Sequence, residues 1–370
     1  MKSLLRTLLV CLISTSTTLA CGWYPFGEDV RFSLVDPSAY DDGGMSPYYY
    51  TFWNYGDGYQ STPENDPNTE LWRKQCNEQV DLSSIYEAVY EMDEDVISEG
   101  ETQNKLILYL RENDREALDY LLFAKSCSGF NNVYSYWEKD SGSDLTRSKK
   151  MLEALKRSQK VESKMLRKRY RFLALRLAFY NRDQERLLAI YRKSFSGEQQ
   201  DAIDYWALYF KVAPEASSAR RNYDMARVFV KAPGKRFGAL SCFSTNISID
   251  QVLAFAKTDA EKASVYAMYA IREQGRALET LKKVQQLAPD HPLLDCLLIR
   301  EVNKVEDWVL TPRYTNFDPT MDPRGRNFDE PNTLIQERIK EDELYAGEIA
   351  TWLEGLSVAS PEKWNLIEAY

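Results

Sequence analysis

The chain has 370 residues, a formal net charge of −9 and a single histidine, His291. Its length suffices for two domains or for one continuous array of helices. One histidine is too few for the usual histidine-based metal sites, and a Ser-His-Asp or Cys-His set could form only around His291. The sequence also contains no Gly-rich phosphate loop and no G-x-S-x-G motif, so the enzyme classes that need them are excluded.

Residues 1–20 have the features of a secretory signal peptide. Lys2 and Arg6 precede an apolar run from Leu8 to Ile13, and Ala20 ends a small-residue cleavage site. The apolar run is shorter than the ~20 residues that a membrane-spanning helix needs. We therefore expect an exported chain that lies in the periplasm or is associated with the outer membrane.

Cys21 follows the signal directly and leaves two interpretations of the mature N-terminus. Cleavage by the lipoprotein peptidase would leave Cys21 acylated, although Thr18 and Leu19 depart from the usual pattern before such a cysteine. Ordinary cleavage after Ala20 is equally compatible. Lipidation would leave four cysteines in the mature chain, an even number, and no pair of them forms a C-x-x-C motif.

Charge is distributed unevenly along the chain. Residues 21–119 carry 22 acidic and 6 basic side chains, whereas residues 147–193 carry 16 basic and 4 acidic ones. A basic region of this kind suits nucleic acid or acidic lipid, but an export signal argues against nucleic acid. We favour the interpretation that the basic helices neutralise the acidic region within the molecule or present a solvated face.

The segment 21–80 is rich in aromatic residues, glycine and proline and has no helical period. Disordered segments are poor in aromatic residues, so we expect an ordered, irregular segment that packs over the helices. Its rings could instead stack on the apolar faces of sugars. The candidates for that role are Trp23, Tyr48, Tyr49, Tyr50, Trp53 and Tyr55.

Helical periodicity begins at Asp81 or Ser83, which are candidate N-caps, and continues to Val305. Two segments within this region, REALDYLLFAKSC and ALETLKKVQQLAP, share one spacing of small and large apolar residues. These residues are Ala117, Leu121 and Ala124 in the first segment, and Ala277, Leu281 and Val284, followed by Pro289, in the second. Spacings of four and three place each set on one helical face, where a neighbouring helix can approach closely.

This spacing resembles the second helix of the tetratricopeptide repeat (TPR). A weaker third match has Arg186 at the small-residue position, 69 residues after Ala117. That gap is close to twice the ~34-residue TPR period, whereas the next gap of 91 residues fits no whole number of repeats. The resemblance implies an all-α solenoid of TPR-like helix pairs over residues 81–305, with degenerate repeats, in a protein of the bacterial cell envelope.

Beyond the repeats we expect a loop over residues 306–332, which is rich in proline and aromatic residues and too long for an ordinary connection. Further helices should follow over residues 333–370, beginning at a capping box of Thr333 and Gln336. A solenoid normally ends in a polar capping repeat, and none is visible before Tyr370. We therefore expect the array to be incomplete, or to be covered by another chain.

Our leading hypothesis is a non-enzymatic cell-envelope scaffold whose repeat surface binds a protein or peptide partner. The alternative is a glycan-binding surface lipoprotein that uses the aromatic residues of segment 21–80. Exported glycan-capture lipoproteins of the starch-utilisation type resemble this chain in outline, but Gly22 to Pro25 do not reproduce the segment that follows their anchor cysteine. We expect no catalytic residues, cofactor, metal or nucleic acid, and membrane contact only through Cys21.

Overall fold

The computed structural model describes residues 27–34, 45, 48–50, 61–99, 102–130, 141–315, 317–321, 324 and 332–359. In this part of the chain the regular elements are all helices, with no β-strand, so the predicted all-α class is confirmed there. None of the described helices is both long enough and apolar enough to span a membrane. The predicted signal peptide, Cys21, Trp23, Trp53 and Tyr55 lie outside the described residues.

Short turns join most of the α-helices in the first half of the chain. These helices are α2 (Pro67–Gln75), α3 (Leu82–Tyr86), α4 (Glu94–Glu99), α5 (Lys105–Asn113), α6 (Arg115–Lys125), α7 (Ser141–Ser158), α8 (Lys164–Tyr180) and α9 (Gln184–Ser194). Three short elements accompany them: the 3-10 turns η1 (Gly27–Asp29) and η5 (Ser128–Phe130), and the π-helical turn η4 (Glu87–Glu91).

The second half of the chain is also helical. Its α-helices are α10 (Ala202–Val212), α11 (Ala219–Lys231), α12 (Arg236–Cys242), α13 (Ile249–Leu253), α14 (Asp259–Arg272), α15 (Leu278–Leu287), α16 (Leu294–Val305), α17 (Thr311–Tyr314) and α18 (Asn332–Ala359). The 3-10 turn η6 (Pro233–Lys235) precedes α12, and the π-helical turn η7 (Glu306–Leu310) joins α16 to α17.

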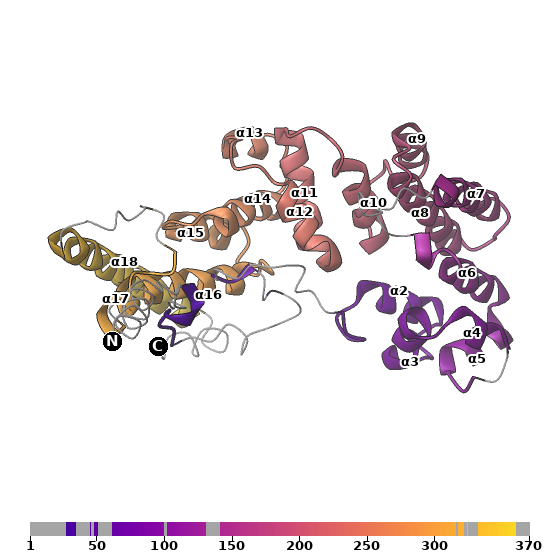
Figure 1. The fold of residues 1–370 in the computed structure, drawn as a ribbon, viewed down its shortest axis with the longest axis horizontal. Coiled ribbons are helices and arrows are strands. Elements are labelled where there is room, and N and C mark those ends of the chain that lie inside the picture. Colours follow the sequence, from indigo (N-terminus) through magenta and orange to yellow (C-terminus); the bar gives the residue numbers. More distant parts are fainter. Residues whose placement is uncertain are drawn as a thin grey trace, which may run out of the picture.

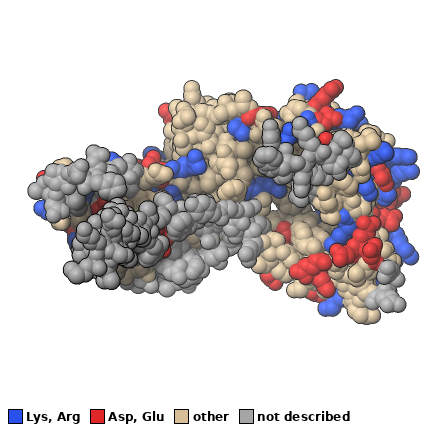
Figure 2. All heavy atoms as spheres, viewed as in Figure 1, with Lys and Arg blue, Asp and Glu red and all other residues tan. Residues whose placement is uncertain are grey.

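The helices form an elongated body (Figure 1). At one end α2 to α6 lie below α7 to α10, and the chain then passes through α11 to α15 to reach α16 to α18 at the other end. Figure 2 shows acidic side chains gathered over the lower helices of the first end and basic ones above them. No ion pair between described residues joins segment 147–193 to segment 21–119, so direct pairing does not neutralise the two regions there.

Side-chain caps explain where several helices begin. The Asp81 carboxylate accepts the Ser84 N–H (2.9 Å) at the start of α3, so Asp81, not Ser83, is the N-cap. Asp114 caps α6 in the same way, with its carboxylate 3.0 Å from the Ala117 nitrogen. These local interactions fix the helix starts independently of tertiary packing.

The predicted repeat-packing residues lie mostly in the core. Ala117 and Leu121 of α6 are buried and Ala124 is half-buried; Leu281 and Val284 of α15 are buried, and Pro289 is exposed in the turn that follows. Ala277 is buried but precedes its helix, which begins at Leu278. The helix therefore begins one residue later than predicted, with Ala277 as its N-cap, while Ala277, Leu281 and Val284 are all buried.

The cap of α15 comes from two other helices. The Glu301 carboxylate on α16 accepts the Ala277 N–H (2.8 Å) and the Lys304 ammonium (2.8 Å), while Tyr345 on α18 donates its hydroxyl to Glu301. The Tyr345 oxygen in turn accepts the Leu278 N–H (3.0 Å). Glu301 and Lys304 are almost fully buried, and their hydrogen bonds offset the cost of burying the pair. One polar cluster thus ties α15, α16 and α18 together.

The predicted loop over residues 306–332 is wrong at its start. Helix α16 continues through η7 into α17, so residues 306–314 are helical. Pro312 lies within this continuous helical run, directly after the π-helical turn, where the irregular hydrogen-bond spacing accommodates a residue that has no N–H to donate. The predicted irregular segment 21–80 likewise contains α2, with Pro67 in its first turn and Asp66 as its N-cap.

The N-terminal segment packs against the C-terminal helices, at the opposite end of the body from α2 (Figure 1). The Tyr50 hydroxyl accepts the Trp308 indole N–H (3.1 Å) and lies 3.3 Å from a carboxylate oxygen of Asp307. Asp307 also accepts the Thr311 hydroxyl (2.9 Å), and its burial raises its pKa. These contacts join residues more than 250 positions apart, so they hold the N-terminal segment against the C-terminal helices.

Replacing Tyr50 by phenylalanine removes the hydroxyl at the centre of this cluster. We expect Tyr50→Phe to lower the free energy of unfolding by about 1–3 kcal/mol, because Trp308 and Asp307 each lose a partner while buried. Urea unfolding measures the change. The control is Tyr314→Phe, the same deletion on a side chain that is 63% exposed, and it should leave stability almost unchanged. Equal midpoints for Tyr50→Phe and the parent protein would contradict this role.

Candidate functional site

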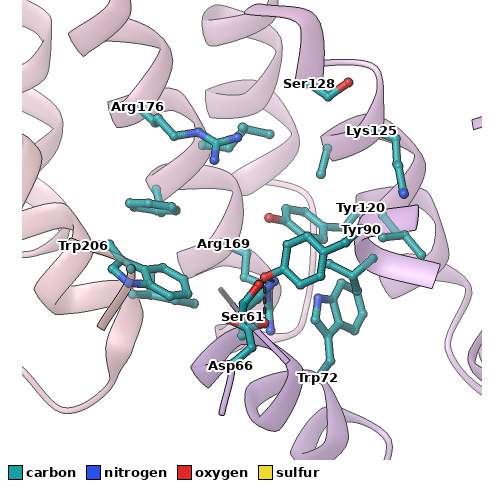
Figure 3. A pocket seen from close by; sticks show the side chains of 18 of the residues that line it. Ser61, Asp66, Trp72, Tyr90, Tyr120, Lys125, Ser128, Arg169, Arg176 and Trp206 are labelled. Atoms are coloured by element: carbon teal, nitrogen blue, oxygen red, sulfur yellow. Dashed lines mark hydrogen bonds between the residues drawn. The ribbon is translucent and has the colours of Figure 1, made fainter. Parts of the chain in front are cut away.

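A cavity of about 800 Å³ lies between the first group of helices and the middle of the chain. Its lining comes from α2, η4 and the residues that follow it, α6, α8, α10 and the turn η6. Figure 3 shows side chains from these two groups of helices facing one another across it. The cavity therefore exists only because α2 to α6 fold back beneath α8 and α10.

Aromatic rings form much of both walls. On one side Trp72 and Tyr120 lie with their ring centres 6.0 Å apart, and on the other Phe172 lies 5.7 Å from Trp206 and 6.0 Å from Phe210. Trp206 is half-buried, whereas the other four side chains are buried. Of these rings only Trp206 keeps part of its surface accessible to a ligand, and the other four form the packed wall around it.

Helix α8 contributes a mixed face to the cavity. Arg169, Phe172, Leu173 and Arg176 recur at spacings of three and four, which place them on one side of the helix. Ser163 caps this helix by accepting the Leu166 N–H. Two arginines therefore lie on the helical face that also carries apolar core residues.

Arg169 is the most unusual of these residues because only 3% of it is exposed. Its guanidinium stacks over the Trp72 ring at 4.6 Å, and Nη1 donates to the Asn68 side-chain oxygen (2.7 Å). Nε and Nη2 have no hydrogen-bond partner among the described residues. Burial lowers the pKa of Arg169; the Tyr120 hydroxyl opposes this shift but does not complete a hydrogen bond of good geometry to those nitrogens.

A hydrogen-bonded chain from the start of α2 fixes the position of Arg169. Asp66, the N-cap of α2, accepts the Tyr90 hydroxyl (2.7 Å), and the Asn68 amide donates to the same hydroxyl (3.0 Å). Although 47% of Tyr90 is exposed, burial of its hydroxyl and the nearby Asp66 charge raise its pKa. Asn68 is thereby held so that its oxygen faces Arg169.

Charge around the cavity is balanced in number but separated in space. Its lining includes four basic and four acidic side chains. Asp93, Glu94 and Asp95 lie together on one rim, near Lys125, whose ammonium donates to the Met92 carbonyl. Asp66 is occupied by Thr69 and Tyr90. No ion pair with a described residue involves Arg169 or Arg176, the two arginines of the α8 wall.

The predicted sugar-binding tyrosines are not part of this cavity. Tyr48, Tyr49 and Tyr50 are at most 3% exposed, with Tyr48 against Phe229 and Tyr50 against Trp308. Their rings are buried by packing, so these three tyrosines present no exposed ring face on which a sugar could stack. Leu121 and Ala124, which we predicted only as repeat-packing residues, do line the cavity.

Sequence analysis missed Arg169, Trp72 and Trp206. The signal for Arg169 was its position on the same helical face as Phe172 and Leu173, where a charged residue interrupts an apolar stripe. No comparable signal marks Trp72 as its partner, because the two residues belong to different helices. Among the described residues no group of three or more metal-ligating side chains comes together.

Comparison with known proteins gives no further assignment. No family model, curated protein or solved structure matches this chain. The chemistry of the cavity is therefore inferred from its own geometry.

His291 lies outside the cavity, in the turn between α15 and α16. It is 5% exposed; its Nδ1 accepts the Leu293 N–H (3.3 Å), which leaves the proton on Nε2 to be donated to the Ser264 hydroxyl oxygen (3.2 Å). Burial, aided by the Lys231 charge, lowers the pKa of His291 to about 4. Protonation would break the Leu293 hydrogen bond, so the neutral ring belongs to the folded state.

Because the chain has one histidine, its NMR titration can be followed without overlap. We expect the ring proton signals to titrate with a midpoint near pH 4 instead of the ordinary 6.5. Since the folded-state pKa is the lower one, the stability that depends on neutral His291 is fully present above pH 6.5. It is lost as the pH falls from about 6.5 towards 4, by about 3 kcal/mol. A midpoint between pH 6 and 7 in the folded protein would contradict this assignment.

Proposed function

We propose that the protein is an exported, non-enzymatic scaffold of the bacterial cell envelope that binds a segment of another protein in the cavity between α2–α6 and α8–α10. In this proposal the helices form a degenerate, TPR-like array of pairs, and the cavity is its binding surface. Binding buries side chains of the partner against the aromatic walls, and charge sets the orientation.

The packing of successive helices supports the TPR-like part of the proposal. Neighbouring pairs such as α7 with α8, α10 with α11, and α14 with α15 pack against one another along the chain. Ala117 and Ala277, where a close approach between helices is expected, are buried.

The observation that carries the binding function is the composition of the cavity walls. Tryptophan, tyrosine and arginine are the residues that most often dominate the free energy of protein–protein binding. All three line this cavity, in Trp72, Trp206, Tyr90, Tyr120, Arg169 and Arg176. Its volume of about 800 Å³ falls within the range of ligand-binding cavities and accommodates several side chains of an extended segment.

A glycan ligand is less well supported. Sugars need exposed ring faces for stacking, and the described tyrosines of the N-terminal segment are buried. Within the cavity Trp72 is 1% exposed and its ring already stacks with Arg169. Trp206 remains as a half-buried ring, which suits an apolar side chain as well as a sugar.

Site-specific photo-crosslinking in the producing bacterium tests the proposal. A benzophenone amino acid in place of Trp206 should give a discrete adduct with one other protein, found in the envelope fraction. The same probe in place of Leu152, which is exposed on α7 and outside the cavity, is the control and should not give that adduct. Absence of a protein adduct specific to position 206 would contradict the proposal, as would recovery of the protein only in the cytoplasm.

A further inference from the structure

The unpartnered atoms of Arg169 lie on one edge of its guanidinium. Nε–H and the nearer N–H of Nη2 are parallel donors, and this pair is one of the two forks by which arginine binds a carboxylate bidentately. The other parts of the group are occupied, since Nη1 donates to Asn68 and one face stacks on Trp72. The free edge therefore has the shape and charge of a carboxylate-binding site.

This arrangement differs from that of another deeply buried cation. Lys304 is fully buried as well, yet its ammonium is paired with Glu301 at 2.8 Å and donates to the Gly275 carbonyl. Leaving two donors of a buried cation without acceptors is unfavourable, and an anion bound at that edge removes the penalty. Binding of an anionic group would therefore satisfy Arg169, whereas Lys304 is already satisfied by Glu301.

Arg176 adds a second cation to the same wall. It lies seven residues after Arg169 on the cavity-lining face of α8 and is half-buried. Its Nε has no hydrogen-bond partner, and no described carboxylate forms an ion pair with its guanidinium. Figure 3 shows both arginines between the Trp206 side of the cavity and the Tyr120 side.

We infer that the cavity recognises an acidic segment of the partner protein, in which a carboxylate binds the Arg169–Arg176 wall of α8 and apolar neighbours pack on the aromatic rings. This inference rests on the proposed function and specifies the chemistry of the partner segment that the cavity binds. Arg176 is the more accessible cation and meets the carboxylate first. Nε and Nη2 of Arg169 are shielded from solvent and the Tyr120 hydroxyl lies near the guanidinium, so neighbouring side chains must shift before a carboxylate reaches these nitrogens.

Selection from a random dodecapeptide library, with the full chain as bait, tests the inference. Peptides whose binding is lost in Trp206→Ala are cavity ligands, and we expect them to be enriched in Asp and Glu beside apolar residues. These peptides are then synthesised, and their affinity is measured by fluorescence anisotropy. The Arg176→Gln variant should bind them roughly 10- to 100-fold more weakly than the parent protein, because a charge-assisted hydrogen bond is lost. Arg169→Gln should have a similar effect, and circular dichroism checks that each variant is folded.

Arg171→Gln provides the matched control, because Arg171 lies on the same helix but does not line the cavity. It should leave the affinity almost unchanged, and rising salt should weaken binding to the parent protein. Neutral peptides that need Trp206 but bind Arg176→Gln as tightly as the parent would overturn the acidic-segment inference alone. Failure to select any peptide that depends on Trp206 would overturn the proposed function as well.

Discussion

The stacking of Arg169 on Trp72 is the contact on which the proposed site depends. Together with the hydrogen bond from Arg169 to Asn68, it joins α8 to α2 across 101 positions of sequence. This contact closes one side of the cavity and holds a buried cation at its wall. A cation–π interaction supplies attraction without neutralising the charge, so the same contact that stabilises the fold leaves a positive group for a ligand.

A second set of contacts between residues distant in sequence lies at the other end of the body. Tyr50, Asp307 and Trp308 form a polar cluster that attaches the N-terminal segment to the C-terminal helices. The Tyr50 hydroxyl, the Asp307 carboxylate and the Trp308 indole find partners within the chain, as do Glu301 and Lys304. Arg300, whose guanidinium lies over the Tyr50 ring, still leaves its Nε without a hydrogen bond to any described residue. Arg169 differs because it lines a cavity and leaves two donors, on the same edge of its guanidinium, without partners in the described part of the chain. The combination of unpartnered donors with a cavity, and not an unpartnered donor alone, marks the candidate binding site.

The helical class and several helix starts could be predicted from the sequence. Both the 3.6-residue period and an N-cap such as Asp81 depend on residues that are only a few positions apart. The errors have equally specific causes. The proline-rich composition predicted a loop from residue 306, although the helix continues through η7 and Pro312 into α17. The helix expected from Ala277 begins one residue later, because Glu301 on α16 caps it at Ala277. The cavity was not predictable, because Trp72 and Arg169 meet only through tertiary packing, which no period in the sequence records.

The most direct measurement is a crystal structure of the full chain bound to an acidic peptide whose binding is lost in Trp206→Ala. We expect a peptide carboxylate about 2.7–2.9 Å from Nε and Nη2 of Arg169. A peptide held in the cavity with both nitrogens still unpartnered, or with no acidic group near α8, would contradict the central role of Arg169.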